Sequence, residues 1–317
     1  MVTAPEPPVL AIFGPTAAGK SAVAEAVAER IPAEIVSADA MQVYRGLPVL
    51  TNQPARPTRL AAVWDLDHEA AVGEYAQLAH AAVDAIRAAG RTPLVVGGTG
   101  LYLRAALADL DLPPAPPPGL RDRFERLYDR LGPEQTHALL RGRDPGAAEV
   151  VHANDRRRIV RALGLAEAGG TLAPAQSRLW NEETRHPTLV FGLVVPKDVL
   201  AARIEARARA MFDHGVEAEV ETALAHPLSS TARKVIGLRE VAELPREEAI
   251  VALTLRTTQY AAYQRKWMRR IPGLIALRAD RPAQEVAEEL LDEVAQRIPL
   301  LGQQEQGGYG IRQSEAD

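Results

Sequence analysis

The chain has 317 residues, with 37 Lys and Arg against 41 Asp and Glu, a net charge of −4 and no cysteine. The lack of cysteine excludes a disulfide framework, Cys-ligated zinc and a thiol nucleophile. No apolar run reaches about 18 residues and no basic region precedes an apolar N-terminal stretch, so neither a membrane span nor a secretory signal is expected. These features predict a cytoplasmic enzyme.

The first third of the chain alternates between short apolar runs and amphipathic segments. Strands are expected at Val9–Phe13, which is uniformly apolar, and at 34–38 and 93–96. Amphipathic helices are expected at 23–31 and 75–86, where apolar residues recur at helical spacing. Alternation of this kind predicts a parallel sheet covered by helices.

The pattern changes in the middle of the chain and then returns. Residues 111–120 contain five prolines and predict a stiff linker, and 121–169 is helical and rich in arginine. A strand is expected again at 189–195, a helix over 200–211 and a last short strand at 273–277.

These elements predict an α/β, P-loop-containing three-layer fold with a central parallel sheet and an inserted helical domain. The expected boundaries are 1–112 for the first part of the core, 113–185 for the helical insertion and 186–300 for the second part of the core. The remaining residues, 301–317, are polar and rich in glycine, so a disordered tail is expected.

The clearest chemical motif is GPTAAGKS at 14–21, which fits the phosphate-loop pattern of Gly, four residues, Gly, Lys and Ser/Thr. A predicted strand precedes it and a predicted helix follows. In that setting backbone N–H groups hold phosphate oxygens, Lys20 adds a positive charge, and the Ser21 hydroxyl is suited to ligate Mg²⁺. The alternative is a glycine-rich turn that binds nothing.

Two polar residues follow predicted strands beside this loop. Asp39 follows the second strand, where its carboxylate could accept a proton from a nucleophile, or could instead be an N-cap or loop aspartate. Thr99 follows Gly97 and Gly98 at the end of the third strand and could approach a ligand or cap a helix. Because no acid ends that third strand, a kinase or another phosphate-handling transferase fits better than a motor or a switch.

Arginines form three further groups. Arg203 and Arg207 are four residues apart on a predicted helix and could clamp a diphosphate, or could belong to a solvated face. Segment 155–161 has four arginines, and 256–270 has five basic and no acidic residues interleaved with aromatic side chains. Basic and aromatic residues together suit a nucleic-acid surface, although solvated faces are the alternative. The negative net charge of the chain is compatible with such a surface, because basic segments and acidic segments offset each other in the total. The stretch 283–297 is one of the acidic segments.

Several ordered segments together resemble the tRNA dimethylallyltransferase (tRNA isopentenyl-transferase) family. The segments that carry the resemblance are GPTAAGKS at 14–21, SADAMQVYRG at 37–46, GGTGLYLRA at 97–105, HANDRRRIVRAL at 152–163, IEARARAMFDHGVEAEV at 204–220 and ARKVIGLRE at 232–240. The resemblance runs from Val9 to about Arg270, which is most of the chain.

The resemblance implies transfer of a dimethylallyl group from dimethylallyl diphosphate to N6 of an adenosine beside the tRNA anticodon. Asp39 matches the general base of the family, Thr99 a threonine beside the diphosphate, and Ser21 the ligand of the Mg²⁺ cofactor. The residues implied to bind the diphosphate are Thr16, Ala17, Ala18, Gly19, Lys20, Ser21 and Arg207.

The implied partners are dimethylallyl diphosphate and the anticodon loop of tRNA, with the protein acting as a monomer and away from membranes. The residues implied to contact tRNA are Asp39, Ala40, Met41, Gln42, Arg121, Arg157, Arg158 and Arg161. Two other functions are compatible with the motifs: a P-loop nucleoside or small-metabolite kinase using ATP, and a phosphate-loop module that binds RNA without catalysis.

The chain departs from the family pattern in three places. Residues 51–54 read Thr-Asn-Gln-Pro where the family usually has Thr-Ala-Lys-Pro, and 61–67 lacks the usual pair of histidines. In 257–267 the basic positions are shifted. These departures concern the tRNA contacts more than the chemistry.

Overall fold

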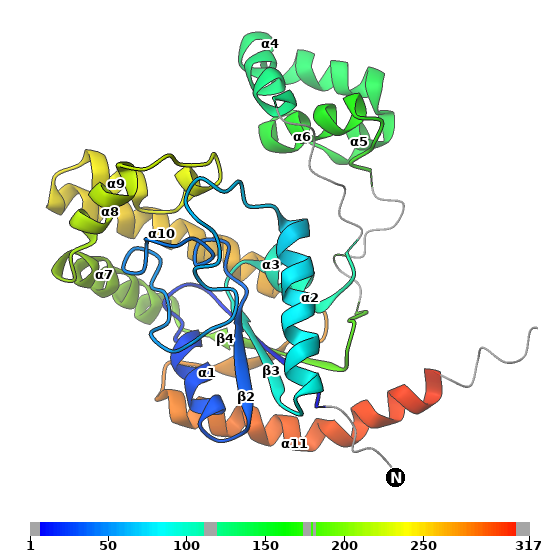
Figure 1. Cartoon of the computed structure of the whole chain (residues 1–317), viewed down its shortest axis with the longest axis vertical. Coiled ribbons are helices and arrows are strands. Elements are labelled where there is room, and N and C mark those ends of the chain that lie inside the picture. The colour runs from blue at the N-terminus through cyan, green and yellow to red at the C-terminus, as the bar shows by residue number, and fades with distance from the viewer. Residues whose placement is uncertain (1–6, 111–118, 174–178, 180–181, 309–317) are drawn as a thin grey trace, which may run out of the picture. The chain divides into compact units, whose positions relative to one another are not determined.

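A computed structural model describes residues 7–110, 119–173, 179 and 182–308, and the chain divides into two compact units (Figure 1). The first unit joins Met1–Asp109 to Glu182–Asp317, and the second is Leu110–Asn181. The second unit overlaps the helical insertion expected at 113–185. Most of the predicted proline linker, at 111–118, lies outside the described residues.

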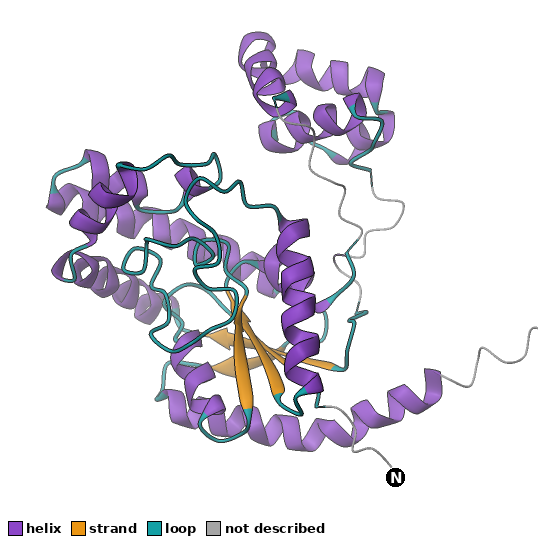
Figure 2. Ribbon diagram, in the orientation of Figure 1, coloured by secondary structure: helices purple, strands orange, loops and turns teal. Residues whose placement is uncertain are grey.

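The first unit is built on a five-stranded parallel sheet, as the sequence predicted (Figure 2). Its strands are β1 (Val9–Phe13), β2 (Ala33–Ser37), β3 (Thr92–Gly97), β4 (Thr188–Val194) and β5 (Ile275–Arg278), in the spatial order β2-β3-β1-β4-β5. The central strand β1 pairs with β3 on one side and with β4 on the other. In the order of the sequence, the second unit is inserted between β3 and β4.

Helices cover both faces of this sheet, which explains why β1 is apolar at every position. Leu10 and Ile12 point into a core shared with α1 (Lys20–Ala28) and α11 (Ala283–Gly308), two helices that pack against each other. Successive side chains of a strand alternate between faces, so the remaining residues of β1 face the opposite layer. In that layer α2 (Val72–Ala88) packs against α3 (Gly100–Leu107).

Four helices and a short 3₁₀ segment lie between β4 and β5. They are α7 (Lys197–Asp213), α8 (Val216–Leu224), the 3₁₀ segment η2 (Ala232–Lys234), α9 (Leu238–Glu243) and α10 (Arg246–Met268). The two longest, α7 and α10, pack against each other. The helix expected over 200–211 corresponds to α7, whereas the sequence reading assigned no element to α8, α9 or α10.

The second unit is helical throughout its described residues, as expected. It comprises α4 (Leu120–Arg143), α5 (Pro145–Val150) and α6 (Arg156–Glu167), packed around Phe124, Leu140 and Ile159. Within α4 the backbone of Gly132 is non-helical and Pro133 follows it, so this element consists of two helices joined at a kink.

Two element ends differ from the sequence reading. The first helix ends at Ala28 rather than at Ile31. Pro32, which has no N–H to donate, follows in the turn that leads into β2. The C-terminal segment was expected to be disordered from residue 301, whereas α11 extends to Gly308. Residues 309–317 lie outside the described part. Among the described residues, no helix has the length and apolar character needed to cross a membrane.

Candidate active site

The predicted phosphate loop connects β1 to α1, and part of its backbone is left-handed. Two of its residues have positive φ, Gly19 at 89° and Ala17 at 62°. Alanine rarely adopts this conformation, and such strain concentrates at functional sites. The Lys20 ammonium folds back over the loop and donates to the carbonyl oxygens of Gly14 at 3.0 Å and Pro15 at 2.9 Å.

Positive charge is held in a poorly hydrated setting beside this loop. Burial lowers the pKa of Lys20 to about 8; the charge of Asp39 opposes that shift and Arg207 adds to it. Burial also lowers the pKa of Arg207, again opposed by Asp39. Both side chains are still largely cationic at pH 7, so a bound anion gains more here than it would at an open surface.

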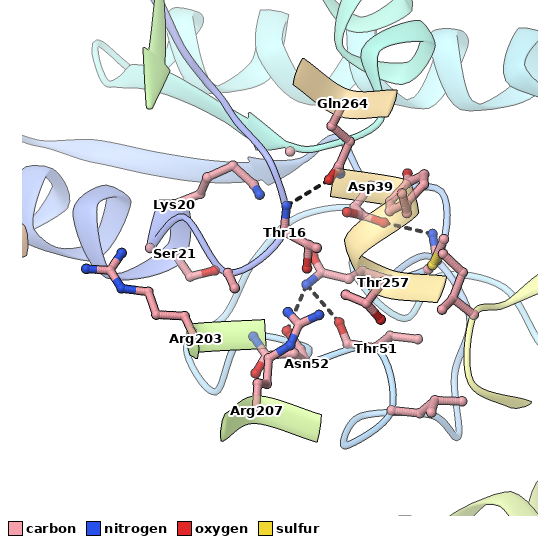
Figure 3. A pocket seen from close by; sticks show the side chains of 18 of the residues that line it. Thr16, Lys20, Ser21, Asp39, Thr51, Asn52, Arg203, Arg207, Thr257 and Gln264 are labelled. Atoms are coloured by element: carbon pink, nitrogen blue, oxygen red, sulfur yellow. Dashed lines mark hydrogen bonds between the residues drawn. The ribbon is translucent and has the colours of Figure 1, made fainter. Parts of the chain in front are cut away.

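A cavity of about 440 Å³ opens over the loop and collects side chains from several distant segments (Figure 3). A volume of this order suits a small organic ligand. Its lining residues are Thr16, Ala17, Gly19, Lys20, Ser21, Ala22, Asp39, Met41, Gln42, Leu50, Thr51, Asn52, Val96, Gly97, Arg203, Arg207, Met211, Ile236, Leu253, Thr257, Tyr260 and Gln264.

Asp39 lies in the wall of this cavity, directly after β2. Its Oδ1 accepts a hydrogen bond from the backbone N–H of Met41 at 2.9 Å, so the carboxylate also organises its own turn. The end of β3 passes very close to this segment: a Cβ on Gly97 would lie 2.0 Å from the Ala38 carbonyl oxygen. The parallel register therefore brings Asp39 beside the phosphate loop, as expected for strand ends at one edge of a sheet.

Thr99 lies at the N-cap position of α3, but its hydroxyl does not cap that helix. The hydroxyl instead accepts from the backbone N–H of Ala40 at 3.1 Å and lies 3.3 Å from the Tyr260 hydroxyl. The helix-capping alternative is therefore wrong. Among the described residues, Thr99 is not one of those that line the cavity, whereas Tyr260 is.

The sequence reading missed a row of uncharged polar side chains on α10. Thr257, Tyr260 and Gln264 are spaced i, i+3, i+7 and all line the cavity. Gln264 is only 2% exposed; its Oε1 accepts from the Thr16 N–H at 2.7 Å and its Nε2 donates to the Gly98 carbonyl at 2.9 Å. The helical spacing of these residues within a basic segment was the available signal.

The residues of segment 256–270, where a nucleic-acid surface was predicted, face in different directions. Arg256 forms an ion pair with Glu240. Trp267 covers the start of α3 so closely that a Cβ on Gly100 would lie 2.1 Å from its ring. Of the three aromatic residues in the segment, Tyr263 is exposed (54%), while Tyr260 turns toward the cavity. Helical packing divides the segment between an inner and an outer face.

A loop on the other side of the cavity is held by side chains from two elements. Both carboxylate oxygens of Glu219, on α8, accept backbone N–H groups, from Val49 at 2.7 Å and from Leu50 at 2.8 Å. Gln42 donates to the Asn52 carbonyl at 2.8 Å. The next residues of the loop, Thr51 and Asn52, line the cavity and belong to a segment that departs from the family pattern.

Arg203 and Arg207 both reach the cavity wall from α7, so the solvated-face alternative is wrong (Figure 3). Arg203 also donates to the Ala279 carbonyl at 3.0 Å. Met41 and Gln42 line the cavity as well, and Ala40 contacts Thr99.

The remaining predicted tRNA contacts belong to the second unit. Arg157 and Arg158 are exposed on α6, while Arg161 is half-buried and burial lowers its pKa. Arg121, at the start of α4, pairs with Glu125 at 3.1 Å. Role assignments for these arginines stay predictions.

In the part of the chain that the structure describes, no group of three His, Asp or Glu side chains could hold a metal ion. Ser21, the predicted Mg²⁺ ligand, lies in the cavity wall next to Lys20. A metal here would therefore need oxygen ligands from a bound phosphate and from water, which is how Mg²⁺ is usually held.

Comparison with known proteins identifies the family. A family model described as IPP transferase matches residues 42–271, and a second described as Isopentenyl transferase matches residues 7–60. Two curated relatives are both called tRNA dimethylallyltransferase. One, from Corynebacterium urealyticum, is 40% identical over 280 residues, 84% of each chain. The other, from Anaeromyxobacter dehalogenans strain 2CP-1, is 38% identical over 296 residues, 90% of this chain and 97% of the relative.

Solved structures agree with this assignment. A tRNA isopentenylpyrophosphate transferase from Bacillus halodurans superimposes with a TM-score of 0.68 at 27% identity, covering 94% of this chain and 99% of that one. A eukaryotic dimethylallyltransferase acting on tRNA superimposes with a TM-score of 0.75, over 92% of this chain and 80% of that one. Its sequence is 23% identical, so this match supports only the likeness in fold. These matches argue against the kinase alternative. Because the IPP transferase model spans well over half of the residues, the chain belongs to the IPP transferase family.

Proposed function

We propose that this protein transfers a dimethylallyl group from dimethylallyl diphosphate to N6 of an adenosine adjacent to the anticodon in tRNA and releases diphosphate. The observation that carries the proposal is a single cavity that joins a phosphate loop to the carboxylate of Asp39. The names of the relatives point to the same reaction.

The diphosphate of the donor binds at the phosphate loop in this proposal. The N–H groups of Ala17 and Gly19 and the N-terminus of α1 are the proposed donors to its oxygens, since the N–H groups of Thr16 and Ala18 are bonded to Gln264 and Pro15. Lys20 and Arg207 add positive charge. Because the C–O bond to the diphosphate breaks during transfer, negative charge grows on the leaving oxygens. Preorganised donors stabilise that charge more strongly than they stabilise the ground state.

Asp39 is the proposed general base. The N6 amine forms a bond to the dimethylallyl carbon as the C–O bond breaks, and the proton lost from N6 passes to the Asp39 carboxylate. Thr99 holds the residue after Asp39, since its hydroxyl accepts from the Ala40 N–H. An adenine inside a stack cannot reach the cavity, so an unpaired, extruded base in a loop is the fitting acceptor.

Contacts to tRNA are proposed on both units. The segment from Asp39 to Gln42 contacts the target adenosine, while Arg121, Arg157, Arg158 and Arg161 contact the phosphate backbone. We also propose that the protein acts as a monomer in the cytoplasm, where its tRNA substrate is found.

Mg²⁺ is the proposed cofactor. The Ser21 hydroxyl in the cavity wall is the ligand from this chain, and the diphosphate would supply further oxygens. When bound, the ion neutralises charge on the leaving diphosphate.

The test mixes purified protein, Mg²⁺, dimethylallyl diphosphate and unmodified tRNA, then measures nucleoside masses after digestion. Isopentenyl adenosine is the expected product. Asp39→Asn keeps the size of the side chain and should abolish turnover while leaving diphosphate binding largely intact. RNA binding with no prenylated nucleoside at any salt concentration would instead favour a non-catalytic RNA-binding module.

The predicted surface of α6 has its own assay. Arg157→Ala should weaken tRNA binding and reduce its salt dependence, because each phosphate contact releases counterions. Unchanged affinity across a salt series would remove this arginine from the tRNA surface.

A further inference from the structure

The Thr99 hydroxyl contacts another hydroxyl that lines the cavity. Thr99 does not belong to the described residues that line the cavity, but Tyr260 does, and the two oxygens are 3.3 Å apart. Tyr260 comes from α10, more than 150 positions further along the chain. The Tyr260 hydroxyl therefore offers a hydrogen-bonded route from Thr99 to the cavity.

The hydrogen bonds around Thr99 leave Tyr260 able to donate. A hydroxyl has one proton and two acceptor positions, and either oxygen can be the donor of the 3.3 Å contact between Thr99 and Tyr260. The backbone N–H of Ala40 occupies one acceptor position of the Thr99 oxygen, and Thr99 keeps a proton that it can donate to Tyr260. Gln264, one helical turn further along, is a second side-chain hydrogen-bond partner of Tyr260. Because Tyr260 also lines the cavity, its phenolic proton can turn to an acceptor bound there while its oxygen accepts from Thr99.

Tyr260 is suited to donate rather than to ionise. Burial raises its pKa, and the negative charge of Asp39 raises it further, so the phenol stays protonated throughout the range of enzyme activity. When Thr99 donates to Tyr260, the chain of hydrogen bonds from Ala40 through Thr99 also polarises the phenolic hydroxyl as a donor.

The position of Tyr260 decides what it donates to. On α10 it lies one turn before Gln264, which binds the phosphate loop at Thr16. On its other side, Thr99 ties it to Ala40, the neighbour of Asp39. The phenol thus lies between the phosphate loop and the carboxylate, where the bond between the prenyl group and the diphosphate would lie. An oxygen of the diphosphate is the acceptor at that place, because it carries negative charge before and during departure.

We propose that Tyr260 is a further catalytic residue, which donates its phenolic hydrogen bond to the diphosphate, and that Thr99 is a positioning residue that acts through Tyr260. The proposal rests on the proposed prenyl transfer for its catalytic part. Its binding part concerns diphosphate alone and is open to measurement without turnover.

The first experiment measures binding of inorganic diphosphate with Mg²⁺ by calorimetry. Tyr260→Phe removes only the hydroxyl and should raise Kd about ten- to a hundredfold, the value of one net hydrogen bond to a charged group. Tyr263→Phe is the matched control: it lies on the same helix with an exposed ring and should leave Kd unchanged. An unchanged Kd for Tyr260→Phe, or an equal rise for Tyr263→Phe, overturns the proposal.

A double-mutant cycle tests the route through Tyr260. Thr99→Val should raise Kd in the wild-type background but add less than about twofold to Tyr260→Phe, while Thr99→Ser restores wild-type binding. Equal effects of Thr99→Val in both backgrounds would mean that Thr99 acts on the ligand directly, and would overturn the positioning role.

The second readout is turnover with dimethylallyl diphosphate and tRNA. Tyr260→Phe should lower kcat about tenfold or more with KM for tRNA unchanged, because the donor meets growing charge in the transition state. A wild-type protein that binds diphosphate through Tyr260 but forms no prenylated nucleoside would overturn the proposed reaction and leave the binding role standing. A wild-type protein that makes the product while Tyr260→Phe matches its kcat would overturn the catalytic role alone.

Discussion

Gln264 joins the phosphate loop to the end of β3, and its replacement is a direct test of how the cavity is held together. The side chain is 2% exposed and makes hydrogen bonds of 2.7 Å to the Thr16 N–H and 2.9 Å to the Gly98 carbonyl. The contact is tight, since a Cβ on Gly98 would lie 2.2 Å from Gln264 Nε2. The substitution Gln264→Leu keeps the volume and removes both polar atoms.

The expected decrease in the free energy of unfolding of Gln264→Leu follows from these two hydrogen bonds. Each contributes about 1 kcal/mol net, and a buried carbonyl left without a donor costs about 1–3 kcal/mol in total. Thr16 borders the cavity, so water can replace its lost acceptor, whereas Gly98 is buried. Because leucine fills the space, the cavity term is small. The sum is about 2–4 kcal/mol, or a decrease in Tm of roughly 5–15 °C for a unit of this size.

Thermal and urea unfolding of wild type and Gln264→Leu measure this difference. Gln259→Leu, at an exposed position of the same helix, is the control for adding a leucine to α10. A Tm for Gln264→Leu within about 1 °C of wild type would refute the reasoning, because it would mean that the two bonds carry no net stability.

A second substitution adds a pH signature. Gln264→Glu can donate to the Gly98 carbonyl only while its carboxyl is protonated, so folding raises the pKa of that carboxyl above the unfolded value of about 4.3. An acid with a raised folded pKa contributes its stability below the unfolded pKa and loses it as pH rises through the folded pKa. Gln264→Glu should therefore be closer to wild type at pH 5 than at pH 8, and an equal deficit at both values would contradict the assignment.

Three further predictions concern the cavity walls. Because burial lowers the pKa of Lys20 to about 8, the affinity for diphosphate should fall as pH rises through that value, and Lys20→Arg should flatten this pH profile. Between pH 8 and 10.5 the unfolded chain binds more protons at Lys20 than the folded chain does. The stability against urea should therefore rise with pH over that range. Glu219→Ala releases two backbone N–H groups of the cavity loop and should raise KM for the prenyl donor about five- to tenfold, while Glu221→Ala, exposed on the same helix, should not. Gly97→Ala places a Cβ 2.0 Å from a backbone oxygen and should abolish soluble folded protein or prenyl transfer, whereas Gly142→Ala, with open space around it, should fold and melt like wild type.

Local sequence was sufficient for the first part of the site. The strand Val9–Phe13 was predicted with its observed ends, and the phosphate loop follows it. Such features are readable because they depend on neighbours in sequence: an apolar run that is buried on both faces, glycines that permit positive φ, and a helix that begins at Lys20. Asp39 was placed in the site by one further rule, that parallel strands end at a common edge.

Contacts between distant segments were not readable in the same way. Gln264 bonds to Thr16 across 248 positions, and Glu219 bonds to Leu50 across 169. Nothing in the composition of the 256–270 segment separates the residues that face the cavity from those that face solvent. That division depends on how α10 is rotated against α3 and α7, which is a property of packing.

The first reading of Thr99 shows the same limit. Its place after two glycines at a strand end is compatible with ligand contact and with helix capping, and both options follow from local geometry. The structure excludes capping, and the hydroxyl binds Ala40 and contacts Tyr260 instead. Its role depends on a helix that the sequence reading did not assign.

The sequence by itself determined the parallel α/β core, the phosphate loop and the family, because short local motifs and their order along the chain specify these features. The absence of cysteine excluded thiol chemistry and so favoured catalysis by a carboxylate, phosphate-binding groups and a metal ion. The tertiary structure alone decided which side chains complete the cavity. Those residues are brought together by burial of helix faces whose partners lie more than a hundred residues away, and no local pattern specifies such pairings.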